Sequence, residues 1–338
     1  HNIHYGDILV RFGEIVSLKQ HQVDALTEEG EAHSPKDYLQ DGDIVIADTA
    51  EDETAGKVAE IQDVTDRKAV AGLHTIFLRP PTGLFVRGWL GYWMNSNAYH
   101  NQLLPYLTGI KVLSLSKSNL ANTEVFYPSK GEQKRIVSAL SSIDTHISAL
   151  EALIAKYEAI KKATVNLLLQ PEMGWRQVKI KDFCPLQRGF DLPKHSRHRG
   201  VFPLVCSNGV SDRIDKYLVK APGVVTGRSG TIGNVHFLGE NFWPHNTTLW
   251  VSSFIDADPL FVFYLLSELG LSRFSGGSGV PTLNRNDVHD TLVEVPSIAG
   301  QHEIAEQIAT IDKTISDCKA QLEKARQLKS GMMSYFFG

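Results

Sequence analysis

The stretch that decides the fold is PSKGEQKRIVSALSSIDTHISALEALIAKYEAIKKATVNLLLQ, at residues 128–170. It returns without a gap at residues 296–338 as PSIAGQHEIAEQIATIDKTISDCKAQLEKARQLKSGMMSYFFG. The identical pairs include Pro128/Pro296, Ser129/Ser297, Gln133/Gln301, Ile136/Ile304, Asp144/Asp312, Ile147/Ile315 and Lys156/Lys324. A long internal repeat indicates a chain of two similar halves.

Each copy of the repeat predicts one long helix with a coiled-coil seam, because its apolar positions advance by alternating steps of four and three. The predicted seam consists of Ile136, Leu140, Ile143, Ile147, Leu150, Ile154 and Tyr157, and of Ile304, Ile308, Ile311, Ile315, Cys318, Leu322 and Ala325. Ser129 and Ser297 are candidate N-caps. Pro171 and Gly174 end the first helix, whose length is roughly 55 Å.

Composition bounds the class of protein. With 338 residues and 42% hydrophobic content, the chain is long enough for two or three domains. No apolar run approaches the roughly 18 residues that a membrane span needs, so no membrane association is expected. The three cysteines (Cys184, Cys206 and Cys318) lack metal-site spacing and favour a reducing, cytoplasmic location. A net charge of -4 argues against a protein that simply coats nucleic acid. It does not exclude a protein that binds nucleic acid through a local cluster of positive charge.

The segments between the helices predict mixed α/β domains. Short β-rich runs alternate with Gly, Asp and Asn at Ile8–Phe12, Ile44–Ala47, His74–Leu78, Val201–Cys206, Gly223–Thr226 and Thr248–Val251. Phe85–Met94 and Leu260–Leu269 indicate short buried helices. The second copy has about 30 residues from Trp175 onward that the first copy lacks. We therefore expect the natural protein to have such a segment before His1.

These motifs together resemble the specificity subunit of type I restriction–modification systems. The most specific match is P-S-x-x-x-Q-x-x-I…I-D…I at 128–147 and again at 296–315. Supporting matches are Gly174–Asp182, the loop GRSGTIG at 227–233, and Ile3–Ile8. The resemblance covers the whole chain.

The resemblance implies an α+β fold in which two target-recognition domains are separated and joined by two long antiparallel helices, with a pseudo-twofold repeat. It assigns 1–127 to a first target-recognition domain without its N-terminal part and 128–170 to the first spacer helix. It assigns 171–295 to the second target-recognition domain and 296–338 to the second spacer helix. Each domain would read one half of a bipartite double-stranded DNA target, and methyltransferase subunits would dock on the helices.

The sequence predicts no catalysis in this chain. The nearest match to a methyltransferase motif, Asp258-Pro259-Leu260-Phe261, is typical of a helix N-terminus with Pro at its first position. The loop GRSGTIG has neither the glycine spacing nor the Lys-Ser/Thr ending of a phosphate loop. Glu132-Gln-Lys134 has a nuclease-like form but lies in the first turn of a helix. No catalytic residue, metal site or cofactor is therefore predicted here, and S-adenosylmethionine is expected in a partner methyltransferase.

Local positive charge predicts DNA contact in the second domain. Residues 187–199 contain four formal positive charges against one negative charge, and such side chains neutralise phosphates. Arg can also bind guanine by two hydrogen bonds. The candidate DNA-binding residues are Arg188, Lys194, Arg197, Arg199, Asn208, Arg228, Ser229, Asn246, Thr247, Ser278, Thr282 and Asn284. Each of the short polar residues, taken alone, is more typical of an ordinary turn.

The first domain has weaker candidates: Arg11, Lys19, Asp48, Thr49, Lys57, His74 and Lys111. Asp48 stands where Arg228 stands in the second copy. It is suited to accept a hydrogen bond from a cytosine amino group, but it is more typical of a residue that caps a loop. A difference between the copies at this position fits two different half-sites, and it equally fits drift between repeats.

Three functions remain open from sequence alone. The favoured one is a non-catalytic DNA-specificity subunit that directs methyltransferase subunits, and a restriction subunit where one accompanies them. The second is a stand-alone methyltransferase or nuclease, which the missing motifs disfavour. The third is a coiled-coil adaptor without DNA contact, which predicts that replacing Arg188, Arg197 and Arg228 by Ala leaves sequence selection unchanged.

Overall fold

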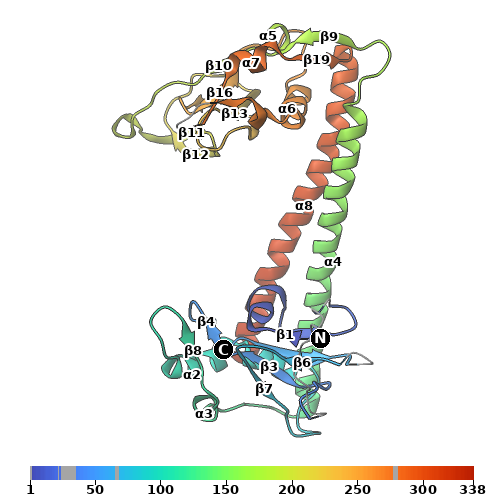
Figure 1. The fold of residues 1–338 in the computed structure, drawn as a ribbon, viewed down its shortest axis with the longest axis vertical. Helices are drawn as coiled ribbons and strands as arrows, with labels where there is room; N and C mark the ends of the chain where they lie inside the picture. Colours follow the sequence, from blue (N-terminus) through green and yellow to red (C-terminus); the bar gives the residue numbers. More distant parts are fainter. Residues whose placement is uncertain (1, 22, 24–35, 65–67, 277–280) are drawn as a thin grey trace. The chain divides into compact units, whose positions relative to one another are not determined.

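The computed structural model describes residues 2–21, 23, 36–64, 68–276 and 281–338. The chain forms two compact units, one of His1–Ala152 with Lys319–Gly338 and the other of Leu153–Cys318. Each unit contains one globular domain and a stretch of both long helices, α4 (Lys130–Leu168) and α8 (Ile298–Phe337) (Figure 1).

The first unit is built on a four-stranded sheet with strand order β2-β5-β3-β7. β2 is parallel to β5, and β3 is antiparallel to both of its neighbours. Two short pairs, β1-β6 and β4-β8, lie outside it. The strands are β1 (Asn2–Ile3), β2 (Ile15–Ser17), β3 (Ile44–Ala47), β4 (Thr49–Ala50), β5 (Val58–Gln62), β6 (Val70–Ala71), β7 (Thr75–Leu78) and β8 (Leu113–Ser114). The helices before α4 are α1 (Trp89–Met94), α2 (Asn97–Leu103), a 3-10 turn at Leu104–Tyr106 and α3 (Lys117–Leu120).

The strand β3 is buried on both faces of this sheet. Ile44 and Ile46 pack in a cluster with α1 and with side chains of α4 and α8. Val45 and Ala47 pack in a second cluster that includes Ile8 of the N-terminal segment. This explains why the strand is a continuous apolar run rather than an alternating one.

The second unit contains a four-stranded sheet, β10-β16-β13-β14, and a three-stranded sheet, β12-β11-β15. Two short pairs, β19-β9 and β17-β18, complete it. The strands are β9 (Arg176–Lys179), β10 (Leu186–Arg188), β11 (Arg199–Cys206), β12 (Gly209–Ile214), β13 (Gly223–Gly227), β14 (Val235–Leu238), β15 (Trp243–Pro244), β16 (Thr248–Val251), β17 (Ser275–Gly276), β18 (Thr282–Leu283) and β19 (Leu292–Val295). The helices before α8 are α5 (Ile180–Phe183), α6 (Pro259–Glu268) and α7 (Arg285–Asp290), with 3-10 turns at Lys194–Ser196 and Leu271–Phe274.

The sheet of the second unit is likewise covered on both faces. Val224 of β13 packs in a large core with α5, α6, α7 and residues of α4 and α8. Its neighbour Val225 packs on the other face with Val205 of β11 and with Phe242. The N-terminus of α6 is capped by Asp258, whose side chain accepts hydrogen bonds from the N–H groups of Leu260 and Phe261. The predicted helix start at Asp258-Pro259 is therefore confirmed.

Two predicted elements differ from the structure. The run Ile8–Phe12 is not a strand, because Asp7–Arg11 forms a helical turn closed by a 2.8 Å hydrogen bond from the N–H of Phe12 to the carbonyl of Asp7. The helix expected over Phe85–Met94 begins only at Trp89. Gly88 before it has φ +90°, a left-handed conformation that interrupts a right-handed helix.

The two long helices pack against each other in antiparallel fashion in both units (Figure 1). Their first turns are capped by Ser129 and Ser297, whose hydroxyls accept from the N–H groups of Glu132 and Gly300. Every predicted seam residue is buried or half-buried; Leu140 and Ile308 are completely buried. Ion pairs across the helices join Arg326 to Glu151 in the first unit and Lys161 to Asp312 in the second.

No helix among the described residues combines the length and apolar character that crossing a membrane requires. The three cysteines are free thiols. Burial raises the pKa of Cys184 to about 12, so this thiol stays protonated and behaves as a core residue.

Candidate nucleic-acid interface

Three loops of the second unit leave the same end of its four-stranded sheet. The strand register pairs Gly227 with Thr248 and Arg188 with Leu249, so the end of β10, the end of β13 and the start of β16 lie together. The loops that follow β10, that join β13 to β14 and that precede β16 therefore converge. They contain half of the candidate DNA-binding residues of this domain: Lys194, Arg197, Arg228, Ser229, Asn246 and Thr247.

Main-chain hydrogen bonds hold two of these loops against each other. The N–H groups of Arg228 and Ser229 both donate to the carbonyl of Thr247, at 2.8 and 3.2 Å. The carbonyl of Arg228 in turn accepts from the N–H of Leu283 at 2.8 Å, and Ser229 pairs with Thr282. Residues from three separate parts of the sequence thus form one surface, because the backbone itself connects them.

Glycines allow the loop after β13 to fold back on itself. A Cβ at Gly227 would collide with the carbonyl oxygen of Thr231. Gly233 has φ +85°, and a Cβ there would lie 2.8 Å from the N atom of Ser272. The loop is therefore compact, and Arg228 is presented from a fixed backbone, as recognition of a base edge requires.

His245 is a residue of this surface that sequence reasoning missed. Its Nε2 lies 3.4 Å from Nη2 of Arg197, and its Nδ1 lies 3.2 Å from the hydroxyl of Thr247. Burial lowers the pKa of His245, and the positive charge of Arg197 lowers it further, against a smaller opposing effect of Asp191. The imidazole is therefore mainly neutral at pH 7 and can share a hydrogen bond with the guanidinium. Arg197 and His245 are 48 positions apart in the sequence, and contacts such as the parallel bridge between Phe190 and His245 bring their segments together, so no local motif could have revealed this pair.

The remaining candidates of the second domain lie on the same unit with differing exposure. Arg188, Lys194, Arg199 and Asn208 are exposed, whereas Arg197 is half-buried and donates from Nε to the carbonyl of Leu192 at 3.0 Å. Asn246 donates from its side-chain amide to Asp191. Asn284 caps α7 by accepting from the N–H of Asn286, so its carbonyl oxygen is already engaged. Ser278 lies outside the described residues.

In the first unit, three of the candidates form one small cluster. The hydroxyl of Thr49 contacts Asp48 and lies 3.2 Å from Nδ1 of His74. The same imidazole nitrogen is 3.6 Å from the Asp48 carboxylate, and the ring packs edge-on against Tyr5. His74 is exposed, and its φ of 55° is an uncommon conformation for a residue with a side chain.

The other candidates of the first domain do not join this cluster through the contacts described. Arg11 forms an ion pair with Asp7 at 2.7 Å. Lys19 and Lys111 are exposed in turns. Lys57 points to the backbone, with Nζ 3.3 Å from the carbonyl oxygen of Leu9 and 3.4 Å from that of Phe12. Burial lowers its pKa; Glu14 opposes this and Lys329 adds to it.

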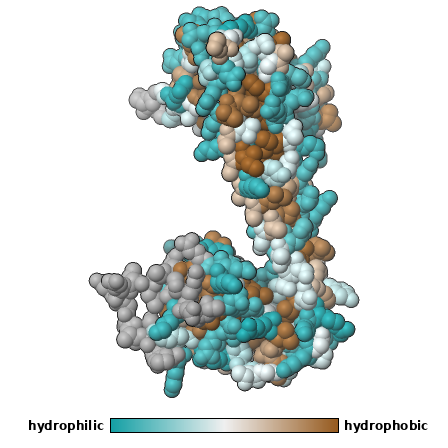
Figure 2. Space-filling model, turned by 90° about the vertical axis from the view of Figure 1, so that its right-hand side faces the viewer, coloured by the Kyte–Doolittle hydropathy of each residue, from teal (hydrophilic) through white to brown (hydrophobic). Residues whose placement is uncertain are grey.

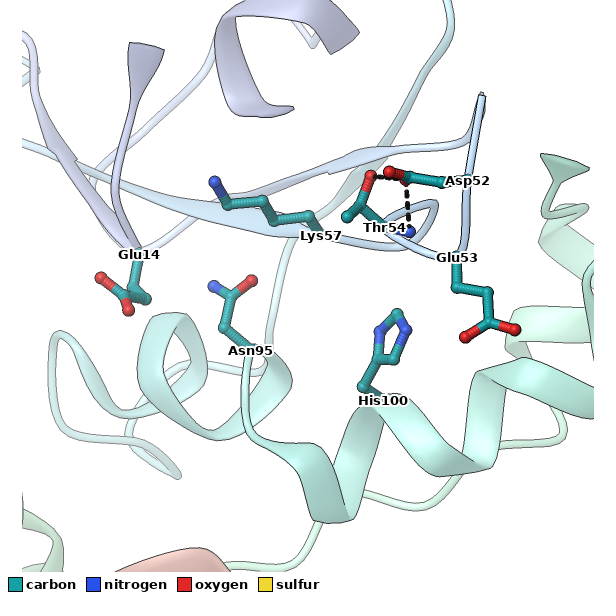
Figure 3. Close-up of a pocket in the computed structure, with 7 residues that line it drawn as sticks. All are labelled: Glu14, Asp52, Glu53, Thr54, Lys57, Asn95 and His100. Carbon is teal, nitrogen blue, oxygen red and sulfur yellow. Dashed lines mark hydrogen bonds between the residues drawn. The ribbon is translucent and has the colours of Figure 1, made fainter. Parts of the chain in front are cut away.

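Lys57 lies in a pocket of about 640 Å³ in the first unit. The pocket is lined by Glu14, Asp52, Glu53, Thr54, Lys57, Asn95 and His100 (Figure 3). The lining contains three carboxylates and one lysine, so it is acidic and poorly suited to phosphate groups. Within the part of the chain that the structure describes, no group of three or more His, Cys, Asp or Glu side chains is arranged to hold a metal ion.

The family is decided by a match that occurs twice. The model of the type I restriction modification DNA specificity domain matches residues 9–162 and again residues 172–326. The chain belongs to this DNA-specificity family. Its two matched regions correspond to the two repeats, and each contains all or most of one globular domain with most of the long helix that follows.

Two solved structures have the same fold as this specificity-family chain. The type I restriction–modification S subunit from M. genitalium is similar with a TM-score of 0.64 at 13% sequence identity; the match covers 96% of this chain and 88% of the S subunit. A chain from a study of the complex assembly and conformational transition of a type I system matches with a TM-score of 0.54 at 15% identity, covering 90% of this chain and 84% of that one. At 13% and 15% sequence identity, these two similarities show a shared fold and nothing more specific.

Both specificity domains are attached to their helices by an equivalent buried glutamine. Gln133 of α4 accepts a hydrogen bond from the N–H of Val86 at 2.8 Å and donates to the carbonyl of Pro128 at 2.9 Å. Gln301 of α8 accepts from the N–H of Asp258 at 2.9 Å and donates to the carbonyl of Pro296 at 3.1 Å. Both side chains are completely buried. The sequence shows that the same glutamine occurs in both copies of the repeat, but it does not show which backbone groups the two side chains bind.

Proposed function

We propose that this chain is a non-catalytic specificity subunit that recognises a bipartite double-stranded DNA target, with one half read by each domain. The observation that supports this best is the double match to a DNA-specificity domain, because two reading domains on one chain suit a target of two parts. The antiparallel helices α4 and α8 would set the gap between the halves. Methyl transfer would belong to partner methyltransferase subunits that bind S-adenosylmethionine, and cleavage to a restriction subunit where one is present.

In the second domain we assign the reading surface to the converging loops around Arg228, Thr247 and Arg197. Exposed Arg188 and Lys194 beside them supply charge for phosphates, which gives affinity without sequence preference. Arg228 on its compact loop is suited to a guanine edge, a contact that is worth about 1–3 kcal/mol of discrimination. In the first domain we assign the Asp48–Thr49–His74 cluster as the weaker counterpart.

The test is selection of DNA from a random pool by the full chain together with the methyltransferase subunits that copurify with it. We expect a motif in two parts separated by a gap of fixed length. A contiguous motif, or no enrichment at all, would contradict the proposal.

Replacing Arg188, Arg197 and Arg228 by Ala distinguishes DNA reading from a purely structural adaptor. We expect the half of the motif read by the second domain to lose its preference, while the other half stays unchanged. Arg213→Ala is a matched control. Arg213 lies on β12 of the same unit, is exposed, and pairs with Glu240 at 2.7 Å. Unaltered selection by the triple variant would favour the adaptor.

We further propose that an apolar stripe on α4 docks the methyltransferase subunits. Leu153, Ile160 and Leu167 are spaced by seven residues and lie outside the seam, with exposed fractions of 37%, 38% and 67%. Figure 2 shows apolar surface among the polar surface of the helices. Large apolar side chains that recur on one exposed helix face are typical of a protein interface.

Ile160→Glu should abolish copurification of the methyltransferase subunits while leaving the helices folded. Asn166→Glu is the matched control, because it adds the same single negative charge at an exposed site of α4 about 120° around the helix. Equal copurification by both variants would remove the stripe from the interface.

A further inference from the structure

Each unit contains a cluster of a tyrosine, an aspartate and a lysine at the junction of its domain with the two helices. In the first unit, Tyr92 of α1 donates its hydroxyl proton to Asp144 of α4 at 2.7 Å. The other oxygen of Asp144 lies 2.7 Å from the ammonium group of Lys329 on α8. That ammonium group stands 5.9 Å from the centre of the Tyr92 ring, so the three groups contact one another; it also pairs with Glu14 at 2.6 Å.

The second unit repeats this arrangement with the helices exchanged. Tyr264 of α6 donates to Asp312 of α8 at 2.8 Å, and Asp312 lies 2.6 Å from Lys161 of α4. Lys161 is 5.8 Å from the centre of the Tyr264 ring. In both units the aspartate belongs to the helix that follows the domain in sequence, and the lysine comes from the other helix. Chance contacts would not reproduce the same roles twice with the helices exchanged.

Burial gives these contacts strength. Tyr92 is completely buried and Tyr264 is 4% exposed. The pKa of both hydroxyls is raised, mainly by burial and additionally by the neighbouring aspartate, so each remains a hydrogen-bond donor. A hydrogen bond to a charged group that is partly shielded from water is stronger and more directional than an exposed one. Each cluster therefore fixes the rotation of α1 or α6 about the helix pair, in addition to its position.

We propose that the two Tyr–Asp–Lys clusters are positioning devices that hold each target-recognition domain at a set angle on α4 and α8, and so determine which gap between the two DNA half-sites is accepted. This rests on the proposed function, since it assigns the gap specificity of that function to named residues. The glutamines Gln133 and Gln301 attach the start of the same helices, so each domain is fixed at two points. A domain held at one point could still turn, whereas two points define an angle.

The test uses Tyr92→Phe and Tyr264→Phe, which remove one hydroxyl each and keep the ring. The full chain with its copurifying methyltransferase subunits selects from a DNA pool in which the two half-sites are fixed and the gap varies. We expect discrimination against gaps one base pair shorter or longer to fall by about tenfold, as for the loss of one charge-assisted hydrogen bond. The base preference within each half-site should stay unchanged.

A matched control separates positioning from general loss of stability. Tyr99→Phe removes a buried hydroxyl whose 2.9 Å hydrogen bond to Thr123 lies entirely within the first domain. It should leave gap discrimination as in the unmodified chain. The double variant Lys161→Asp with Asp312→Lys should restore the discrimination that Asp312→Lys alone loses, because the tyrosine hydroxyl can accept from a lysine as well as donate to a carboxylate.

The outcomes are distinct. If both Tyr→Phe variants keep the gap discrimination of the unmodified chain, or if Tyr99→Phe lowers it equally, the positioning role is wrong while the specificity function stands. If the unmodified chain selects no split motif, the specificity function itself fails and the positioning role fails with it.

Discussion

At the scale of single residues, the most demanding positions are buried polar side chains that each satisfy backbone groups. Gln301 accepts from the N–H of Asp258 and donates to two carbonyls, those of Pro296 and Asp256, both at 3.1 Å. Glu60 has the same role inside the first domain, where it accepts from the N–H groups of Gly88 and Gly91. Burial raises the pKa of Glu60 against the lowering effect of these hydrogen bonds. Such side chains define a unique packing, because a shifted helix would leave backbone groups without partners.

Gln301→Ala should lower the free energy of unfolding by about 2 kcal/mol, because it leaves buried backbone groups unsatisfied. Urea denaturation of the full chain measures this. Gln102→Ala is the control, since Gln102 also exchanges hydrogen bonds with a backbone, that of Glu124, but at an exposed site. Water can replace its contacts, so a loss equal to that of Gln301→Ala would contradict the explanation.

His245 predicts a pH dependence of stability. Its pKa is lowered in the folded chain, chiefly by burial, so the unfolded chain binds a proton at a higher pH than the folded chain does. The stabilising contribution of neutral His245 is therefore present above its unfolded pKa of about 6.5 and is lost as the pH falls. Thermal unfolding between pH 7 and pH 5 should show a smaller loss of stability for His245→Gln than for the unmodified chain. His146→Gln, on the exposed surface of α4, serves as the control; identical slopes for the His245 variant and the unmodified chain would contradict the assignment.

At the scale of elements, the long helices serve each domain as part of its core. Leu140 of α4 and Phe337 of α8 pack with α1 in the first unit. Val165 of α4 and Ile308 of α8 pack in the core of the second unit. The same helices therefore stabilise both domains and pair with each other. This double role explains why α4 and α8 each have more apolar positions than the seam of a simple two-stranded coiled coil needs.

Leu140→Ala should cost about 2–5 kcal/mol of stability, because Leu140 is fully buried between the helices and the domain. Chemical denaturation followed by tryptophan fluorescence, to which Trp89 and Trp93 of α1 contribute, measures this loss. Leu167→Ala removes the same atoms from a side chain of α4 that is 67% exposed, and it should cost well under half as much. Similar losses for the two variants would show that the pairing of the helices contributes little to stability.

At the scale of the whole molecule, the proposed spacer role ties the length of the helix pair to the gap in the DNA target. Insertion of one heptad into each helix, near Ala155 in α4 and near Ala320 in α8, keeps the seam in register. The insertion adds about 10 Å of helix. That length corresponds to about three base pairs along the DNA axis.

We expect the doubly extended chain to select a longer gap between unchanged half-sites in the DNA-selection experiment. The control has the heptad in α4 alone, which breaks the ion pairs and the seam between the helices and should abolish a defined gap. An unaltered gap in the doubly extended chain would refute the spacer role.

The sequence by itself determined the elements that depend on local or repeated patterns. The two long helices, their seam, their serine caps and the duplication follow from periodicity and self-similarity, which are written along the chain. The strands at Ile44–Ala47 and Thr248–Val251 follow from apolar runs with turn residues beside them. The family was also accessible, because its most specific motif lies in the duplicated helices.

Only the tertiary structure decided which distant side chains meet. Lys161 contacts Asp312, and Arg197 contacts His245, because backbone packing brings separate segments together at distances that no local spacing encodes. The turn at Asp7–Arg11 was likewise decided by tertiary context: its residues have strand-like composition, yet Ile8 is buried against β3 from a helical backbone. Local sequence sets which elements can form, whereas the burial of polar and apolar groups in one fold sets how their side chains combine.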